Sequence, residues 1–261
     1  MTKLVTSLCT LPLMFSGLTW AETASDDLQD MSDPLAVYTQ VGGGITDMGL
    51  NLKIGQSYDT GVENLGGMNV FEVKGFAGDI TGWSDSQTGP RNNSIDSIRF
   101  RNFEASLESG RGRQLDVNYN LAQEFGTASY SFIQALPKFG QLSLFPLLGA
   151  GVAFGNNVMG DHQQTISGYS VPGTFAVVGT YAKYALSDRL WLNYNPMWMN
   201  TLSGSDIYKQ HGFEDHDSVL THEIALSYQV SPRFNIRYFA NWSEYSDISK
   251  GNHRIEFNYQ L

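Results

Sequence analysis

The C-terminal part of the chain alternates apolar and polar side chains with a period of two residues. In the stretch SPRFNIRYFANWSEY, from Ser231 to Tyr245, the apolar residues of one parity are Phe234, Ile236, Tyr238, Ala240 and Trp242. Successive side chains of a strand point to opposite faces of its sheet, so this pattern predicts a β-strand with one apolar and one polar face. The pattern alone leaves open which of the two faces is turned toward the inside of the protein.

Similar runs recur through most of the sequence, and no segment has a convincing helical periodicity. Counting back from the C-terminus, we predict twelve strands, at 252–261, 233–245, 218–230, 189–200, 169–186, 141–155, 127–136, 113–121, 97–108, 67–78, 48–57 and 35–43. The three strands nearest the N-terminus show the alternation least clearly, so a count of ten strands is an alternative. Either number is even, which returns the chain to the side where it started.

The predicted connections alternate between short and long. Short ones lie near 109–112, 137–140, 187–188 and 231–232, and long polar ones lie near 79–96, 156–168 and 201–217. Many of the strands run for about ten residues or more, which is enough to cross a membrane at a tilt, whereas strands in globular proteins are most often about 5–6 residues long. These features favour an all-β fold, a closed antiparallel transmembrane β-barrel, over a soluble sandwich.

Aromatic residues make up 13% of the chain, and several lie near the ends of predicted strands. Aromatic girdles at both membrane surfaces are typical of membrane barrels. The residues that we assign to such girdles are Tyr184, Trp198, Tyr228, Trp242, Tyr245 and Tyr259. The chain also ends within a predicted strand, and because a free sheet edge cannot face lipid, this strand is expected to pair with the first one.

The N-terminus predicts export. Lys3 precedes a broken apolar stretch, and Thr19 and Ala21 place small residues at the −3 and −1 positions of a cleavage site, so we assign residues 1–21 to a signal peptide. Residues 22–34 are acidic and lack periodicity, which predicts a flexible segment. The barrel is then expected to occupy residues 35–261.

Cleavage of the signal peptide would remove the single cysteine, Cys9, together with Lys3. The remaining 15 basic and 26 acidic residues give a net charge of −11. A mature chain without cysteine excludes a small fold that depends on disulfides. The negative charge argues against nucleic acid as a partner.

With these features, residues 35–261 resemble the outer-membrane β-barrels of Gram-negative bacteria. The terminal stretch RIEFNYQL resembles this class most specifically, since its members usually end in an alternating strand with an aromatic last residue. Here the last residue is Leu261, and Tyr259 lies two positions before it. The resemblance implies an outer-membrane location, contact with membrane lipid, periplasmic termini, and recognition of the C-terminal strand by the outer-membrane assembly machinery. Monomeric barrels of about this size include acidic-sugar porins, nucleoside channels and a few lipid-processing enzymes.

If the apolar face points outward, the charged residues of the other parity line the interior of the barrel. The expected basic lining residues are Lys53, Lys74, Arg99, Arg101, Lys183, Arg237 and Arg254, and the acidic ones are Glu72, Glu104, Asp116, Glu223 and Glu256. Seven basic against five acidic residues would favour anions, although the whole chain is acidic. The alternative is that Arg–Glu pairs between neighbouring strands form a neutral network that fills a narrow interior.

Two further stretches are candidates for a functional role. The run GAGVAFG (Gly149–Gly155) places small residues on one face, which either widens the interior or lets another element pack closely. The loop HGFEDHD (His211–Asp217) gathers two histidines and three acidic residues that could hold a divalent cation or activate water. Nothing in the sequence fixes a ligand geometry there, and no nucleophile elbow, phosphate loop or dinucleotide fingerprint occurs. We therefore assign no catalytic residue, no metal ligand and no cofactor.

The sequence thus favours passive passage of small solutes through an outer-membrane barrel, with a weak preference for anions and no enzymatic activity. Two alternatives remain open. One is a non-conducting barrel that serves adhesion or envelope structure, and the other is a hydrolase with a rim site in the loop His211–Asp217.

Overall fold

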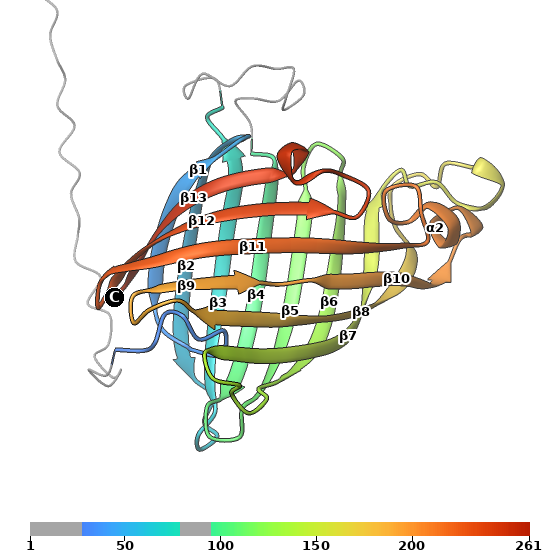
Figure 1. Ribbon diagram of the computed structural model, residues 1–261. Helices are drawn as coiled ribbons and strands as arrows, with labels where there is room; N and C mark the ends of the chain where they lie inside the picture. Colours follow the sequence, from blue (N-terminus) through green and yellow to red (C-terminus); the bar gives the residue numbers. More distant parts are fainter. Residues whose placement is uncertain (1–27, 79–94) are drawn as a thin grey trace, which may run out of the picture.

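The computed structural model describes residues 28–78 and 95–261. The predicted signal peptide, residues 22–27 and most of the predicted loop 79–96 lie outside this part of the chain. The described strands form one sheet (Figure 1) and are β1 (Gln40–Thr46), β2 (Gly49–Asp59), β3 (Gly66–Phe76), β4 (Ser97–Ser106), β5 (Arg111–Asn120), β6 (Phe125–Gln134), β7 (Leu142–Asn156), β8 (Tyr169–Ala185), β9 (Leu190–Tyr194), β10 (Met197–Gly204), β11 (Ser218–Ser231), β12 (Phe234–Ser243) and β13 (Asn252–Gln260). The short helical pieces are η1 (Asp161–Gln163), α2 (Asp206–His211) and η2 (Ile248–Lys250).

The sheet closes on itself, because β13 pairs with β1 from Gln260 opposite Gln40 to Arg254 opposite Thr46. Strands β9 and β10 are two halves of one strand, since both lie between β8 and β11. The interruption falls at Asn195 and Pro196, where proline supplies no N–H for the ladder. The barrel therefore has twelve antiparallel strands, which confirms the predicted fold and count and excludes ten.

The first and last strands place both termini of the barrel at one end, which we call the turn end; the other is the loop end (Figure 1). The turn-end connections are 60–65, 107–110, 135–141, 186–189 and 232–233, and the loop-end connections are 47–48, 77–96, 121–124, 157–168, 205–217 and 244–251. Two of the loop-end connections are thus tight turns. The first strand begins at Gln40, not at residue 35 as predicted, because residues 35–39 pack against the inside of the barrel mouth.

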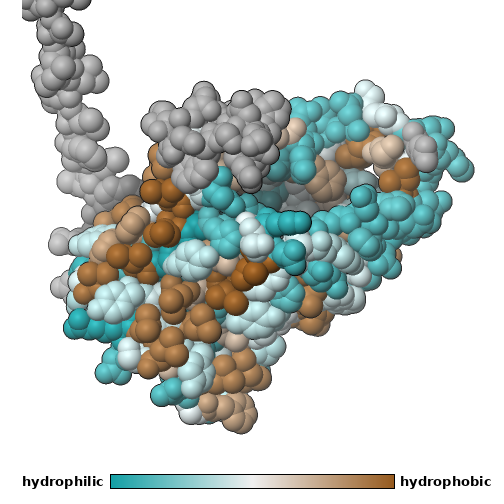
Figure 2. All heavy atoms as spheres, turned by 45° about the horizontal axis from the view of Figure 1, so that its top comes forward, coloured by the Kyte–Doolittle hydropathy of each residue, from teal (hydrophilic) through white to brown (hydrophobic). Residues whose placement is uncertain are grey.

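The outside of the barrel is apolar. Figure 2 shows apolar side chains gathered over the flank of the barrel and polar ones around the loop end. Among the most exposed hydrophobic residues are Leu52, Ile54, Phe132 and Leu148, each more than half exposed. The predicted girdle residues that are exposed are Trp198 and Tyr245 near the loop end and Tyr184, Tyr228 and Tyr259 near the turn end.

The inside, in contrast, carries many buried polar side chains. On β12 the inward Asn235 is 1% exposed, whereas the outward Tyr238 is 44% exposed. An apolar exterior around a closed polar interior is the arrangement of a membrane-spanning barrel, the kind found in bacterial outer membranes. Within the described residues, no helix is both long and apolar enough to cross a membrane.

Candidate functional site in the barrel interior

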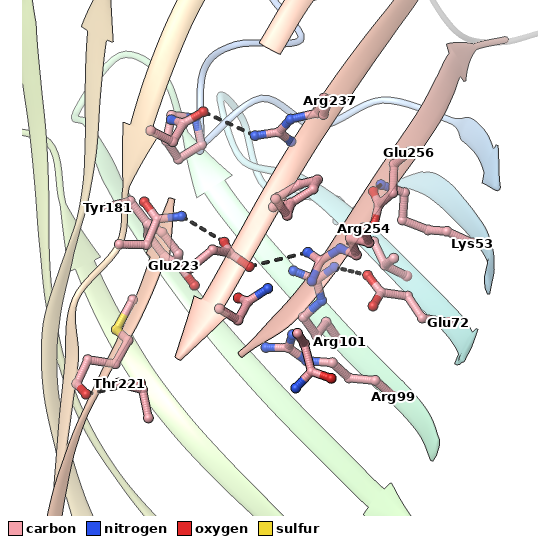
Figure 3. Close-up of a pocket in the computed structure, with 18 of the residues that line it drawn as sticks. Lys53, Glu72, Arg99, Arg101, Tyr181, Thr221, Glu223, Arg237, Arg254 and Glu256 are labelled. Atoms are coloured by element: carbon pink, nitrogen blue, oxygen red, sulfur yellow. Dashed lines mark hydrogen bonds and ion pairs between the residues drawn. The ribbon is translucent and has the colours of Figure 1, made fainter. Parts of the chain in front are cut away.

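Of the twelve residues that the sequence assigns to the lining, all except Glu104 lie on the inner side of the barrel. Eight of them border one large internal cavity, namely Lys53, Glu72, Arg99, Arg101, Glu223, Arg237, Arg254 and Glu256 (Figure 3). Lys74 and Asp116 belong to the same region, since they pair with the cavity residues Glu72 and Arg99. Lys183 lies apart from them, on β8 near the turn end, and borders a second cavity.

Except for Lys183, these charges come from β2–β5 and β11–β13, whose inner side we call the charged wall. Each of its carboxylates is paired: Glu72 with Arg101 and Lys74, Asp116 with Arg99, Glu223 with Arg254, and Glu256 with Arg254 and Lys53. Within this set the Arg254 guanidinium is central, with nitrogen–oxygen distances of 3.2 Å to Glu223 and 2.7 Å to Glu256. The network of pairs that the sequence left as an alternative therefore exists.

Two of these pairs bridge strands that are not neighbours. One joins Glu223 on β11 to Arg254 on β13 across β12. The ammonium of Lys53 on β2 lies 3.3 Å from Glu256 on β13, so the lysine side chain passes across β1. Gly42 on β1 makes this passage possible, because a Cβ there would lie 3.2 Å from Lys53 Cε and 2.6 Å from Asn258 Oδ1. Gly42 thus leaves space for an ion pair that links β2 to β13 across β1, where the barrel closes.

Arg237 is the exception within the charged wall. Its guanidinium donates to Ser227 Oγ at 2.9 Å and to Asn193 Oδ1 at 3.0 Å, both neutral, and forms no ion pair with a described residue. Its carbon Cζ lies 4.8 Å from the ring centroid of Phe239, against which Arg254 also packs at 3.8 Å. Arg237 therefore brings a positive charge to the cavity border that no carboxylate in the described part of the chain neutralises.

Glu104 was predicted to line the interior, and this prediction is wrong. Its neighbour Phe103 borders the cavity, so Glu104 points to the outer side of β4. There it binds Arg113, and Tyr58 donates to it at 3.3 Å. The period-two pattern fails in β4 because aromatic and charged residues occur on both faces. Phe100 and Glu104 lie on the outer face, whereas Arg101 and Phe103 lie on the inner face. Without Glu104, the predicted lining contains seven basic and four acidic residues.

Strands β6–β10 present a different inner side, which we call the apolar wall. Its buried residues are Ile133, Phe145, Leu147, Phe175 and Val177, with Met197 and Met199 packed beside them. On β7 and β8 both sides of the strand are therefore largely apolar. Gly151 receives the ring of Phe175, because a Cβ at this glycine would lie 2.5 Å from Phe175 Cζ. Of the two interpretations of GAGVAFG, close packing by a neighbouring side chain holds at Gly151.

The loop-end connection 205–217 folds against the upper part of the apolar wall. Phe213 meets Phe175 edge to face with ring centroids 5.7 Å apart, and Tyr208 of α2 lies over Gly173. Burial raises the pKa of the Tyr208 hydroxyl to about 12. Ser205 caps the N-terminus of α2, because its hydroxyl accepts a hydrogen bond from the Tyr208 N–H.

The histidine side chains of this connection contact backbone oxygens and an aromatic ring. His211 Nδ1 and His216 Nδ1 contact backbone oxygens of Asp215 and Glu214, at 3.2 and 2.8 Å, and His216 also stacks on Tyr245. The Glu214 carboxylate accepts a hydrogen bond from Ser243. The residues that the structure describes contain no group of three or more His, Cys, Asp or Glu side chains placed to hold a metal ion.

The main cavity has a volume of about 560 Å³, which is within the range of small-molecule sites. Besides the charged wall it is bordered by Tyr181, by Met197 and by Met31, Pro34, Ala36 and Tyr38 of the segment ahead of β1. Sequence reasoning missed this segment, as well as Phe239, Asn193 and Ser227 around Arg237. Alternation places each strand residue inside or outside, but it does not show which inner residues meet across the barrel.

No family model matches the sequence, and no match to a curated protein is found. Among solved structures, the chain is similar to a NanC porin at 8% identity, with a TM-score of 0.53 over 85% of this chain and 100% of that chain. It is also similar to a KdgM porin in complex with disordered oligogalacturonate, at 10% identity and a TM-score of 0.49 over 86% and 99%. The outer membrane channel DcaP of Acinetobacter baumannii matches at 11% identity and a TM-score of 0.37 over 87% and 96%. The likeness to NanC concerns the fold alone, which is a closed outer-membrane β-barrel.

Proposed function

We propose that the protein is a passive channel for small solutes in the outer membrane and that it favours anions. The observation that carries the proposal is Arg237, a cation on the cavity border that contacts only neutral groups. The carboxylates of the charged wall are already neutralised by the other cations. A negatively charged solute in the middle of the cavity would therefore meet an unbalanced positive charge, and rings of such charges select anions in pores.

Two further carboxylates border the cavity, but they belong to segments at its ends. Asp33 lies ahead of β1 at the turn end and receives the Leu35 N–H at 2.8 Å, and Glu214 lies in the loop-end connection bound to Ser243. The middle of the cavity thus keeps its basic excess, which extends the sequence-based expectation from a count of residues to a particular guanidinium.

Purified protein in planar lipid bilayers under a salt gradient tests this proposal through the reversal potential. We expect an anion-selective current, and Arg237→Gln should lower the anion-to-cation permeability ratio by about threefold, the factor that corresponds to an energy on the order of RT. Arg113→Gln is the matched control, because this arginine lies on the outer side of the barrel. An equal change in both variants, or none in Arg237→Gln, would contradict the anion preference.

A non-conducting barrel is the second candidate, and the segment ahead of β1 favours it, since Met31 and Leu35 are each 5% exposed within the barrel mouth. Absence of current from the wild type and from variants that loosen this segment would favour that candidate. The rim-site hydrolase has no comparable support in the geometry, because the two histidines of the loop His211–Asp217 contact backbone oxygens.

We also propose that the assembly machinery recognises β13, which closes the barrel against β1 and exposes Ile255, Phe257, Tyr259 and Leu261 on its outer side. Tyr259→Ser should reduce the fraction of protein that reaches the membrane as a folded barrel, as judged by heat-dependent mobility in gels. Tyr228→Ser on β11 is the control, because it removes a similarly exposed outer tyrosine from a strand that is not paired with the terminal strand.

A further inference from the structure

Residues 28–39 run ahead of β1 and cross the inside of the barrel at the turn end (Figure 1). Met31, Leu35 and Ala36 of this segment are only 5–6% exposed. From Pro34 onward the side chains alternate between two environments. Pro34, Ala36 and Tyr38 border the main cavity, whereas Leu35 and Val37 pack with the hydrophobic cluster of the apolar wall.

The second half of the segment has an apolar anchor. Leu35 and Val37 fill space left by two glycines, since a Cβ at Gly112 would lie 3.1 Å from Leu35 Cδ2 and one at Gly66 would lie 3.4 Å from Val37 Cβ. Further along, Thr39 Oγ1 and Ser57 Oγ are 2.8 Å apart, and the Thr39 carbonyl accepts the Leu261 N–H at 3.0 Å. Residues 35–39 are therefore held by burial and by hydrogen bonds to two strands.

The first half has a polar anchor. The Lys183 ammonium lies 3.3 Å from the Asp30 carboxylate and also donates to the Ser32 hydroxyl. The side chain of Asp30 is 65% exposed, and ion pairs in such positions contribute little. Met31 adds a sulfur contact with Gln229 Nε2 at 3.3 Å. Residues 28–33 are thus held mainly by polar contacts around one buried side chain, Met31, whereas residues 35–39 are held by several buried apolar side chains.

The first half of the segment separates two spaces. The main cavity, of about 560 Å³, and a second cavity of about 490 Å³ at the turn end share Met31 and Ser32 in their borders. The second cavity is otherwise bordered by turn-end residues such as Gln141, Asp188 and Pro232. Movement of residues 28–33 would join the two spaces without displacing Leu35 or Val37.

We propose that residues 28–33 form a gate that closes the turn end of the barrel, hinged at Pro34 and held shut by the contact of Asp30 and Ser32 with Lys183. This inference rests on the proposed channel function and adds its regulation. The gate opens by release of the polar anchor, a local opening that leaves the barrel and the apolar anchor intact. The size of the open population sets how often a solute can pass.

A thiol probe tests the gate without relying on a current. In the full chain with Cys9→Ser, Met31→Cys places a single thiol within residues 28–33, between the two cavities. The rate at which a charged thiol reagent labels this thiol measures how often the thiol is accessible to water. Adding Asp30→Asn and Ser32→Ala should raise the labelling rate by up to about fivefold, the ratio expected for the loss of one exposed ion pair. The charge exchange Asp30→Lys with Lys183→Asp should return the rate toward that of the parent.

The matched control is Asp188→Asn, which removes a carboxylate from the border of the same turn-end cavity without touching residues 28–33. An unchanged rate in the Asp30→Asn and Ser32→Ala variant, or an equal rise in the control, would overturn the gate. Bilayer recordings of the same proteins separate the two proposals. If labelling accelerates and conductance rises with it, both stand, and if labelling accelerates while no variant conducts, the gate stands and the channel function fails.

Discussion

The charged wall and the apolar wall belong to the same sheet, yet different interactions stabilise their inner sides. The charged wall neutralises its carboxylates through pairs within the sheet, and it leaves a cavity in front of Arg237. The apolar wall cannot face water without cost, and it is covered by Leu35 and Val37 from one end and by Phe213 from the other. The covering segments thus lie against the apolar wall, and the cavity proposed as the solute path lies along the charged wall.

The largest expected effect comes from opening the apolar wall. Phe175 is 2% exposed, and Phe175→Ala should lower the free energy of unfolding by about 3–5 kcal/mol, since it removes a buried aromatic ring from a packed cluster. Urea unfolding in lipid vesicles, followed by gel mobility, measures this change. The neighbouring Val178 points outward and is 43% exposed, so Val178→Ala should cost much less. Equal losses at the two positions would show that the inner side is not a core.

The next effect compares two arginines of the charged wall that both pack on Phe239. Arg254→Met should destabilise the barrel by roughly 3 kcal/mol, because it leaves two buried carboxylates with fewer partners. Arg237→Met should cost about 1 kcal/mol, because it breaks only hydrogen bonds to neutral groups while removing an unpaired charge. The two unfolding curves, measured side by side, check the order, and a larger loss for Arg237→Met would mean that its charge is neutralised in a way absent from this network.

A smaller effect concerns the loop-end cover of the apolar wall. Phe213→Ala should loosen the connection 205–217 by about 1–2 kcal/mol, since the ring packs against Phe175 and Tyr208. Tryptic cleavage after Lys209, which is exposed in α2, should then become faster while the barrel stays intact. His216→Ala is the control within the same connection, because His216 stacks on Tyr245 and not on the wall.

The two walls also differ in how far the sequence predicted them. On β11–β13 most outer residues are apolar and most inner residues are polar, with Phe239 as an inner exception. Alternation therefore placed Glu223, Arg237, Arg254 and Glu256 on the inner side, where they border the cavity. On β7 and β8 both sides are largely apolar, so a period-two pattern does not distinguish inner from outer residues. Apolar residues on both sides of a membrane strand indicate that something covers the inner side, and the structure shows that the covering residues are Leu35, Val37 and Phe213.

The sequence did not predict which charged side chains pair with one another inside the barrel. Which cation meets Glu256 depends on the register and on Gly42, which lets Lys53 cross β1. The charges of residues 22–34 suggested a flexible segment, yet the same acidic character at Asp30 supplies a partner for Lys183. From composition alone, an acidic residue such as Asp30 is expected to be solvated. Only the position of Lys183 in the folded barrel shows that Asp30 attaches its segment to β8.

The smallest expected effect tests that anchor through pH. Burial raises the pKa of the Asp30 carboxyl, but hydrogen bonds from Ser32 and the charge of Lys183 outweigh it, so the pKa lies below its ordinary value of 3.8. A carboxyl whose pKa is lowered by folding contributes stability above its ordinary pKa, and this contribution is lost as the pH falls through the lowered value. Because Asp30 is largely exposed, we expect the wild type to exceed Asp30→Asn in stability by less than about 1 kcal/mol near neutral pH. The difference should stay constant down to about pH 5 and vanish in stronger acid. Urea midpoints of both proteins across this range measure it, and a difference that grows with acidity would mean that the carboxylate is not what Lys183 holds.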